Sequence, residues 1–175
     1  MLWRFEQVGL IWWLALGIIL AVELVVLLCI RKRSVLCRIA IPWFVFIPYL
    51  FFVLAATVLS RTPIPKEYDL ISLDVSTAWT VGPGIYGLID TASELGMNVA
   101  VFIPIGYLLA RITNGRKWLV FGACLLITLG IEALQLITKR GFFELADMLL
   151  NMTGAVIGYL LFCLMRCIRH RNAAK

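Results

Sequence analysis

The sequence predicts an all-α, polytopic transmembrane helix bundle of about five spans, with its N-terminus outside and its C-terminus inside. Hydrophobic residues make up 62% of the 175 residues and charged residues only 15%, and the mean hydropathy is +0.97. This composition leaves too little polar surface to cover a soluble domain. The lengths of the apolar stretches and the alternation of basic residues between them support the same fold class.

Five apolar stretches are long enough to cross a bilayer. A hydrocarbon core about 30 Å thick requires roughly 20 residues of helix, because lipid offers backbone groups no hydrogen bonds. The stretches cover about residues 8–30, 39–60, 95–112, 118–137 and 146–165. The first resembles a signal peptide, but it is long and its positive cluster follows the apolar residues. We therefore predict that it is a retained span.

The chain divides into three predicted regions. Residues 1–38 form the first span and a basic cytoplasmic loop, 39–166 form the main helical membrane domain, and 167–175 form a basic cytoplasmic tail. No segment between the spans is long enough for a soluble domain. The sequence does not define an oligomeric state.

Basic residues set the predicted orientation, because lysine and arginine in short loops resist translocation. Eleven of the sixteen follow the first, third and fifth stretches: Arg31, Lys32, Arg33, Arg38, Arg111, Arg116, Lys117, Arg166, Arg169, Arg171 and Lys175. The other five would lie outside: Arg4, Arg61, Lys66, Lys139 and Arg140. The net charge of +6 is thus explained by topology and by attraction to anionic lipids. We predict no nucleic-acid partner, no cofactor and no metal site.

Polar residues within the later stretches gather near their predicted outer ends. Glu94 and Asn98 lie four residues apart and therefore share a helix face. Two similar pairs begin with Glu132 and Asp147. The predicted set, which we call the outer polar layer, comprises Arg61, Glu94, Asn98, Glu132, Gln135, Arg140, Asp147 and Asn151.

Charged groups in hydrocarbon must be paired or reach water, because an uncompensated charge there costs several kcal/mol on most estimates. One interpretation is structural: Arg61 or Arg140 pairs with Glu132 or Asp147 and holds the spans together. The other is functional: the layer forms a polar pocket, open to the outside, for a lipid headgroup.

Small residues and prolines also shape the predicted spans. Gly154 and Gly158, like Gly106 and Ala110, are spaced four apart and should let helices approach closely. Pro104 removes a helix hydrogen bond and should bend the span 95–112. Pro48 should have the same effect in the span 39–60.

Two sequence patterns resemble signatures of VanZ-like membrane proteins. The first, N-x-x-x-F-x-P-x-G, is matched by Asn98, Phe102, Pro104 and Gly106. The second combines E-x-x-Q, an arginine and D-x-x-x-N-x-x-G-x-x-x-G. Its matching residues are Glu132, Gln135, Arg140, Asp147, Asn151, Gly154 and Gly158.

The resemblance extends over about residues 59–161 and includes Arg61-Thr62, which is similar to the Arg-Thr that opens the family's outer loop. The chain departs from relatives in that loop, where it has Asp69-Leu-Ile-Ser72-Leu73 instead of an Asn-Leu-Ile-Pro-Phe segment. The resemblance implies a multi-pass accessory protein of the bacterial cytoplasmic membrane. The founding member is linked to low-level resistance to teicoplanin, a lipoglycopeptide.

Two functional hypotheses follow. In the first, the outer polar layer binds the headgroup of a membrane lipid, a lipoglycopeptide antibiotic or a lipid-linked wall precursor. In the second, the protein is an integral-membrane enzyme that modifies a lipid-linked envelope component, with Glu132 or Asp147 as general base or nucleophile. We favour binding, because carboxylates without an outer histidine or metal cluster are a weak catalytic signal.

Overall fold

The computed structural model describes residues 35–59, 61–63, 71–76 and 84–173, and the first predicted span, 8–30, lies outside them. The elements are α3 (Val35–Leu54), the π-helical turn η1 (Ala55–Leu59), β1 (Ile71–Ser72), α4 (Gly84–Ile112), α5 (Lys117–Thr138), β2 (Phe143–Glu144) and α6 (Leu145–Ala173). The all-α bundle is thus confirmed, with one two-residue parallel strand pair added.

Four helices within the described residues are long and apolar enough to cross a membrane: Ile41–Leu59, Gly84–Ile112, Lys117–Thr138 and Leu145–Asn172. They correspond to the four later predicted spans. Large apolar side chains on their outer surfaces remain exposed, including Trp118 at 81% and Ile137 at 76%. Such surfaces suit a lipid environment, since lipid replaces the buried partners that a soluble helix needs.

Two helices are longer than the predicted spans. The sequence places the third span at 95–112, but α4 begins at Gly84, where φ is +76°. Likewise, α6 continues past residue 165 to Ala173 through the basic residues. Hydropathy marks where a helix meets lipid, whereas helical hydrogen bonding continues through polar residues that favour helix. At about 1.5 Å per residue, each 29-residue helix is roughly 43 Å long and exceeds the bilayer core.

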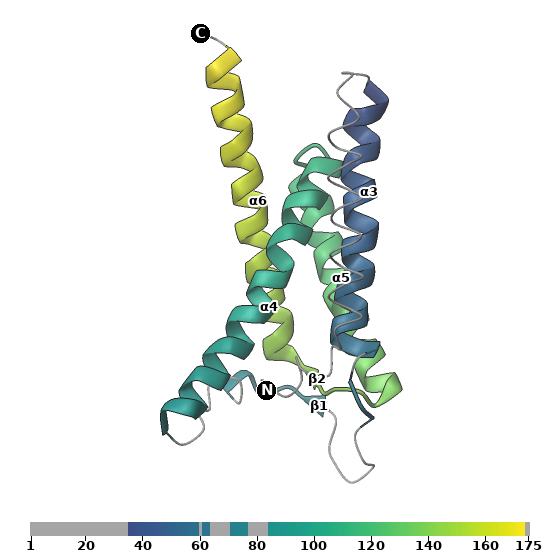
Figure 1. Ribbon diagram of the computed structural model, residues 1–175, viewed down its shortest axis with the longest axis vertical. Helices are drawn as coiled ribbons and strands as arrows, with labels where there is room; N and C mark the ends of the chain where they lie inside the picture. The colour runs from purple at the N-terminus through teal and green to yellow at the C-terminus, as the bar shows by residue number, and fades with distance from the viewer. Residues whose placement is uncertain (1–34, 60, 64–70, 77–83, 174–175) are drawn as a thin grey trace.

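Among the described helices, α4 and α6 form the most extensive contact, and α3 and α5 pack beside them (Figure 1). The predicted role of the small residues in packing is confirmed. A Cβ added at Gly154 would collide with the Val99 carbonyl oxygen, and one at Gly158 would collide with that of Ile103. The missing side chains therefore let the two backbones touch.

The prolines lie within continuous helices. Pro42 and Pro48 are inside α3, and Pro104 is inside α4. Because Pro104 has no N–H, the helix loses one hydrogen bond one turn before it. In the same region, the Tyr49 hydroxyl of α3 donates to the carbonyl oxygen of Val101 at 3.0 Å. This contact joins α3 to α4 beside the interrupted turn.

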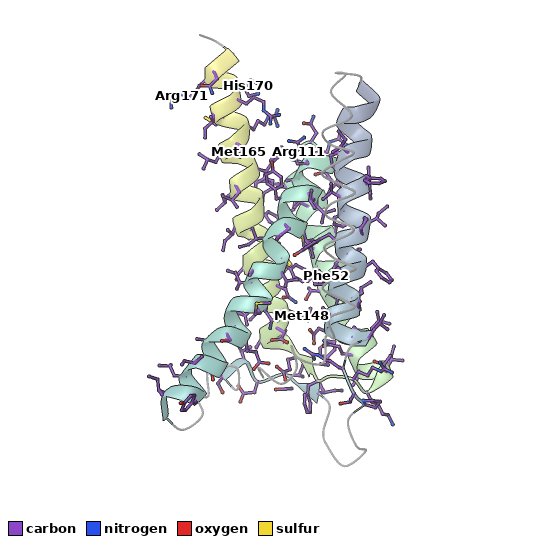
Figure 2. The ribbon with its side chains drawn as sticks, viewed as in Figure 1. Phe52, Arg111, Met148, Met165, His170 and Arg171 are labelled. Carbon is purple, nitrogen blue, oxygen red and sulfur yellow. The ribbon has the colours of Figure 1, made fainter. Side chains whose placement is uncertain are left out.

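The basic residues after α4 and near the end of α6 lie at one end of the bundle, and the strand pair lies at the other. Figure 2 shows Arg111 at the end of α4 and His170 and Arg171 toward the free end of α6, all at the end opposite β1 and β2. This arrangement agrees with the alternation of basic residues on which the predicted orientation depends.

Replacement of Gly154 by alanine should destabilise the bundle. The added methyl group would meet backbone atoms of α4, which cannot rotate away, so we expect a loss of about 1–3 kcal/mol, as for other overpacked sites. Gly122→Ala is the matched control, because Gly122 on α5 has nothing within 4 Å of the added Cβ. Thermal unfolding in detergent would measure both, and equal midpoints would contradict the proposed backbone contact.

The predicted orientation can be tested with single cysteines in a background whose five native cysteines are replaced by serine. We expect a membrane-impermeant maleimide to label Ser76→Cys in intact cells, because residue 76 lies at the predicted outer end. Asn172→Cys, near the end of α6, should be labelled only after permeabilisation. The reverse pattern would show that the orientation is wrong.

Candidate functional site

The outer polar layer begins where α3 ends. Helix α3 finishes in the π-helical turn η1, and the last carbonyls of a helix have no partners within it. Side chains at the far end of α5 and just after it supply two donors. Gln135 Nε2 donates to the Thr57 carbonyl at 3.1 Å, and Arg140 Nη1 donates to the Leu59 carbonyl at 2.8 Å. These bonds fix the outer ends of α3 and α5 together.

The chain turns sharply after α5. Lys139 adopts the left-handed conformation with φ of 54°, and the backbone N–H of Arg140 returns to the Gln135 carbonyl at 2.9 Å. The next residue must be small: a Cβ on Gly141 would lie 2.7 Å from Arg61 Nη1 and 3.1 Å from Gln135 Cδ. The turn therefore brings the Arg61 guanidinium and the Gln135 amide against the same backbone atoms.

Glu132 is the most buried acid of the layer, at 1% exposure. Its Oε2 accepts a hydrogen bond of 3.0 Å from the backbone N–H of Glu144. Glu144 belongs to β2, where it pairs in parallel register with Ser72 of β1. The outer loop thus contributes the short strand that holds β2 beside Glu132.

Asp147 is half-buried at the start of α6. Its Oδ1 accepts a hydrogen bond of 2.6 Å from Asn98 Nδ2 of α4. Two residues that the sequence placed in the layer by helical spacing are therefore in direct contact. This hydrogen bond offsets part of the desolvation cost of the carboxylate and fixes its orientation.

The carboxylates of Glu132 and Asp147 lie in one electrostatic environment. Glu132 and Asp147 are close enough to repel each other, Glu144 acts on both, and Glu94 acts on Asp147. Arg61 attracts both. Glu132 also accepts a hydrogen bond from the backbone N–H of Glu144, and Asp147 accepts one from the Asn98 amide.

The remaining predicted members lie at the edges of this cluster. Glu94 is exposed on α4, and Arg140 is engaged with the end of η1. Asn151 lies one turn deeper on α6 and donates from Nδ2 to the Thr128 hydroxyl of α5 at 2.8 Å. Asn151 and Thr128 are 6% and 0% exposed, so this bond ties α5 to α6 at the inner edge of the layer.

Sequence reasoning missed Thr128, Glu144 and Thr57. Thr128 lies four residues before Glu132, so the spacing rule used for the other pairs would have found it. Glu144 lies three residues before Asp147, but its bond to Glu132 depends on a strand pair that no local pattern indicates. Thr57 contributes only a carbonyl, which carries no signal in the sequence.

Among the residues that the structure describes, no three His, Cys, Asp or Glu side chains gather as a metal site would require. The acids of the layer are instead spread over α4, α5 and α6.

The family model for VanZ/LLP1 matches residues 35–166, which include every member of the outer polar layer. The chain belongs to the VanZ/LLP1 family. No curated protein and no solved structure matches it. Membership in VanZ/LLP1, together with the four apolar helices, identifies a membrane protein and supports a VanZ-like accessory or resistance role in general terms.

The buried Asn151–Thr128 bond should contribute to stability. Thr128→Val keeps the shape of the side chain but leaves the Asn151 amide without its acceptor, so we expect a loss of roughly 0.5–2 kcal/mol. Thr153→Val is the matched control, because Thr153 is exposed and bonds only within its own helix to the Leu149 carbonyl. If the two variants unfold alike in detergent, the buried bond contributes nothing measurable.

Proposed function

We propose that the outer polar layer binds the headgroup of a lipid or of a lipoglycopeptide, and that the protein acts in this way as an accessory protein of the bacterial cytoplasmic membrane. The observation that carries the proposal is the pair of carboxylates, Glu132 and Asp147, held near each other within an apolar bundle. Ionisable groups at membrane depth are costly, and they commonly mark binding or transport sites.

A purely structural role explains these carboxylates less well. Neutral pairs already join the helices: Gln135 with the Thr57 carbonyl, and Asn151 with Thr128. By contrast, Glu132 and Asp147 add mutual repulsion and a desolvation cost. Apolar residues of similar size are often equally stabilising at buried charged positions. The charges are therefore better explained by a ligand than by packing.

The proposed biological role is a contribution to glycopeptide resistance of the teicoplanin type. A lipid-tailed antibiotic must anchor in the membrane surface, and in the predicted orientation the layer lies at the outer end of the helices, where such a molecule would insert. A protein that binds such a headgroup, or that binds the lipid-linked wall precursor beside it, would alter how much antibiotic reaches its target.

A second candidate is an enzyme that modifies a lipid-linked envelope component. The observation that favours it is the Asn98–Asp147 bond, because an oriented and half-buried carboxylate is a suitable general base. In this case Arg61 or Arg140 would hold the phosphate of the substrate.

Mass spectrometry of the purified protein after incubation with envelope lipids and lipid-linked wall precursors would distinguish the two. We expect a retained lipid of unchanged mass. Asp147→Asn should reduce its retention by about tenfold, since it removes the charge while preserving an acceptor for Asn98. A substrate whose mass changes with the wild type but not with Asp147→Asn would favour the enzyme, and loss of neither binding nor reaction would contradict both.

Asp74→Asn is the control for this experiment. Asp74 is exposed at the same end of the bundle, and the side chain and backbone N–H of Ser76 hold the pKa of its carboxyl below its usual range. The substitution therefore removes one negative charge outside the layer and preserves an acceptor for Ser76. Retention should be unchanged in this variant.

A further inference from the structure

The charge of the outer polar layer is unbalanced. Among the described residues, the charged groups that act on Glu132 and Asp147 are the two carboxylates themselves, Glu94, Glu144 and Arg61. Arg140, the other guanidinium of the layer, is engaged with the Leu59 carbonyl, so these groups comprise four acids and two cations. A phosphate or another anion placed among them would meet more repulsion than attraction, whereas a cation would relieve it.

One buried hydrogen-bond acceptor in the layer is also unsatisfied. Gln135 is 2% exposed, and its Oε1 has no hydrogen-bond partner among the described residues. The assignment of its amide is fixed by the other end, because Nε2 donates to the Thr57 carbonyl. A flipped amide would bring two oxygens together. Gln135 Oε1 is thus a buried acceptor that requires a donor.

This acceptor belongs to the same place as the acids. Gln135 follows Glu132 by three residues on α5, so the two side chains share a face. Its amide carbon lies against Gly141, beside the Arg61 guanidinium. This guanidinium attracts the carboxylates of both Glu132 and Asp147. The excess of acids and the unmet acceptor therefore describe one site.

We propose that the headgroup bound at the outer polar layer carries a primary ammonium group, which donates to Glu132, Asp147 and Gln135 Oε1. An ammonium group has three donors, no acceptor and one positive charge, and so it satisfies both deficits. The two carboxylates and the amide oxygen are three acceptors, which match the three N–H donors of an ammonium group, whereas the described part of the chain has no group of three His, Cys, Asp or Glu side chains that could hold a metal ion. This inference rests on the proposed headgroup-binding function.

The exposure of the acidic side chains and of Gln135 indicates the direction from which the ammonium group would enter. Glu94 is exposed, Asp147 is half-buried, and Glu132 and Gln135 are almost fully buried. Exposure thus decreases from α4 toward α5. The ammonium would approach between the outer parts of α4 and α6, while the rest of the headgroup stays nearer to water.

Membrane phospholipids and lipoglycopeptides can both supply such an amine, so the test has two arms. In one, the purified full-length protein is titrated with dihexanoyl phosphatidylethanolamine and with its N-acetyl derivative. In the other, teicoplanin is compared with N-acetylated teicoplanin. Acetylation removes the charge and two of the donors but leaves the acyl chains and the remaining polar groups. Native mass spectrometry would measure bound fractions.

We expect the free amine to bind at least about tenfold more tightly than its acetylated form, a difference equivalent to roughly 1.4 kcal/mol, in at least one arm. The arm that shows the preference identifies the source of the amine. Equal binding of both forms in both arms would overturn the inference and leave the proposed function intact. Binding of neither form in either arm would overturn both.

Variants locate the amine within the layer. Asp147→Asn should reduce the preference for the free amine severalfold, and Asp74→Asn should leave it unchanged. Glu94→Gln gives a second measurement at an exposed position, where folding is not at risk, and should produce a smaller reduction. If all three variants keep the full preference, the amine binds elsewhere and the inference is wrong.

Discussion

Lipid provides no hydrogen bonds, and the arrangement of this bundle follows from that constraint. Each polar group that enters the helices must find its partner in the protein. The Thr57 carbonyl at the end of η1 is bonded by Gln135 of α5, and the Val101 carbonyl near Pro104 is bonded by Tyr49 of α3. Asn151 of α6 reaches Thr128 of α5. Every one of these contacts joins two different helices, so satisfying the polar groups also determines which helices are neighbours.

Close packing of α4 on α6 provides the second part of the framework. The glycines of α6 allow its backbone to touch that of α4 at Val99 and Ile103. Asn98 precedes Val99, and at this short separation its amide can reach the carboxylate of Asp147. Larger residues in place of the glycines would hold the helices apart and lengthen that bond. The position of the Asp147 carboxylate thus depends on the glycines of α6, which lie two turns away and allow the close contact with α4.

Much of this arrangement was predictable, and the failures have physical causes. The stretches 39–60 and 118–137 match their helices closely because their apolar lengths are set by the bilayer. The start of α4 at Gly84 was missed because its first turns carry polar residues. Helical spacing correctly placed Asn98 and Asp147 in one layer. The partner of Glu132 was missed because it depends on pairing between Ser72 and Glu144, which are far apart in the sequence.

The two kinds of polar group in the layer therefore have different consequences. Neutral pairs such as Asn151 with Thr128 cost little to bury and are sufficient to hold the helices together. Carboxylates add a charge that the bundle does not need for cohesion, yet α5, β2 and α6 hold them in fixed positions. Rigid neutral contacts around surplus charges are the arrangement expected of a preorganised binding site, because a charged partner then pays little to order the groups that receive it. The constraint that lipid imposes on folding thus also prepares the layer for a ligand.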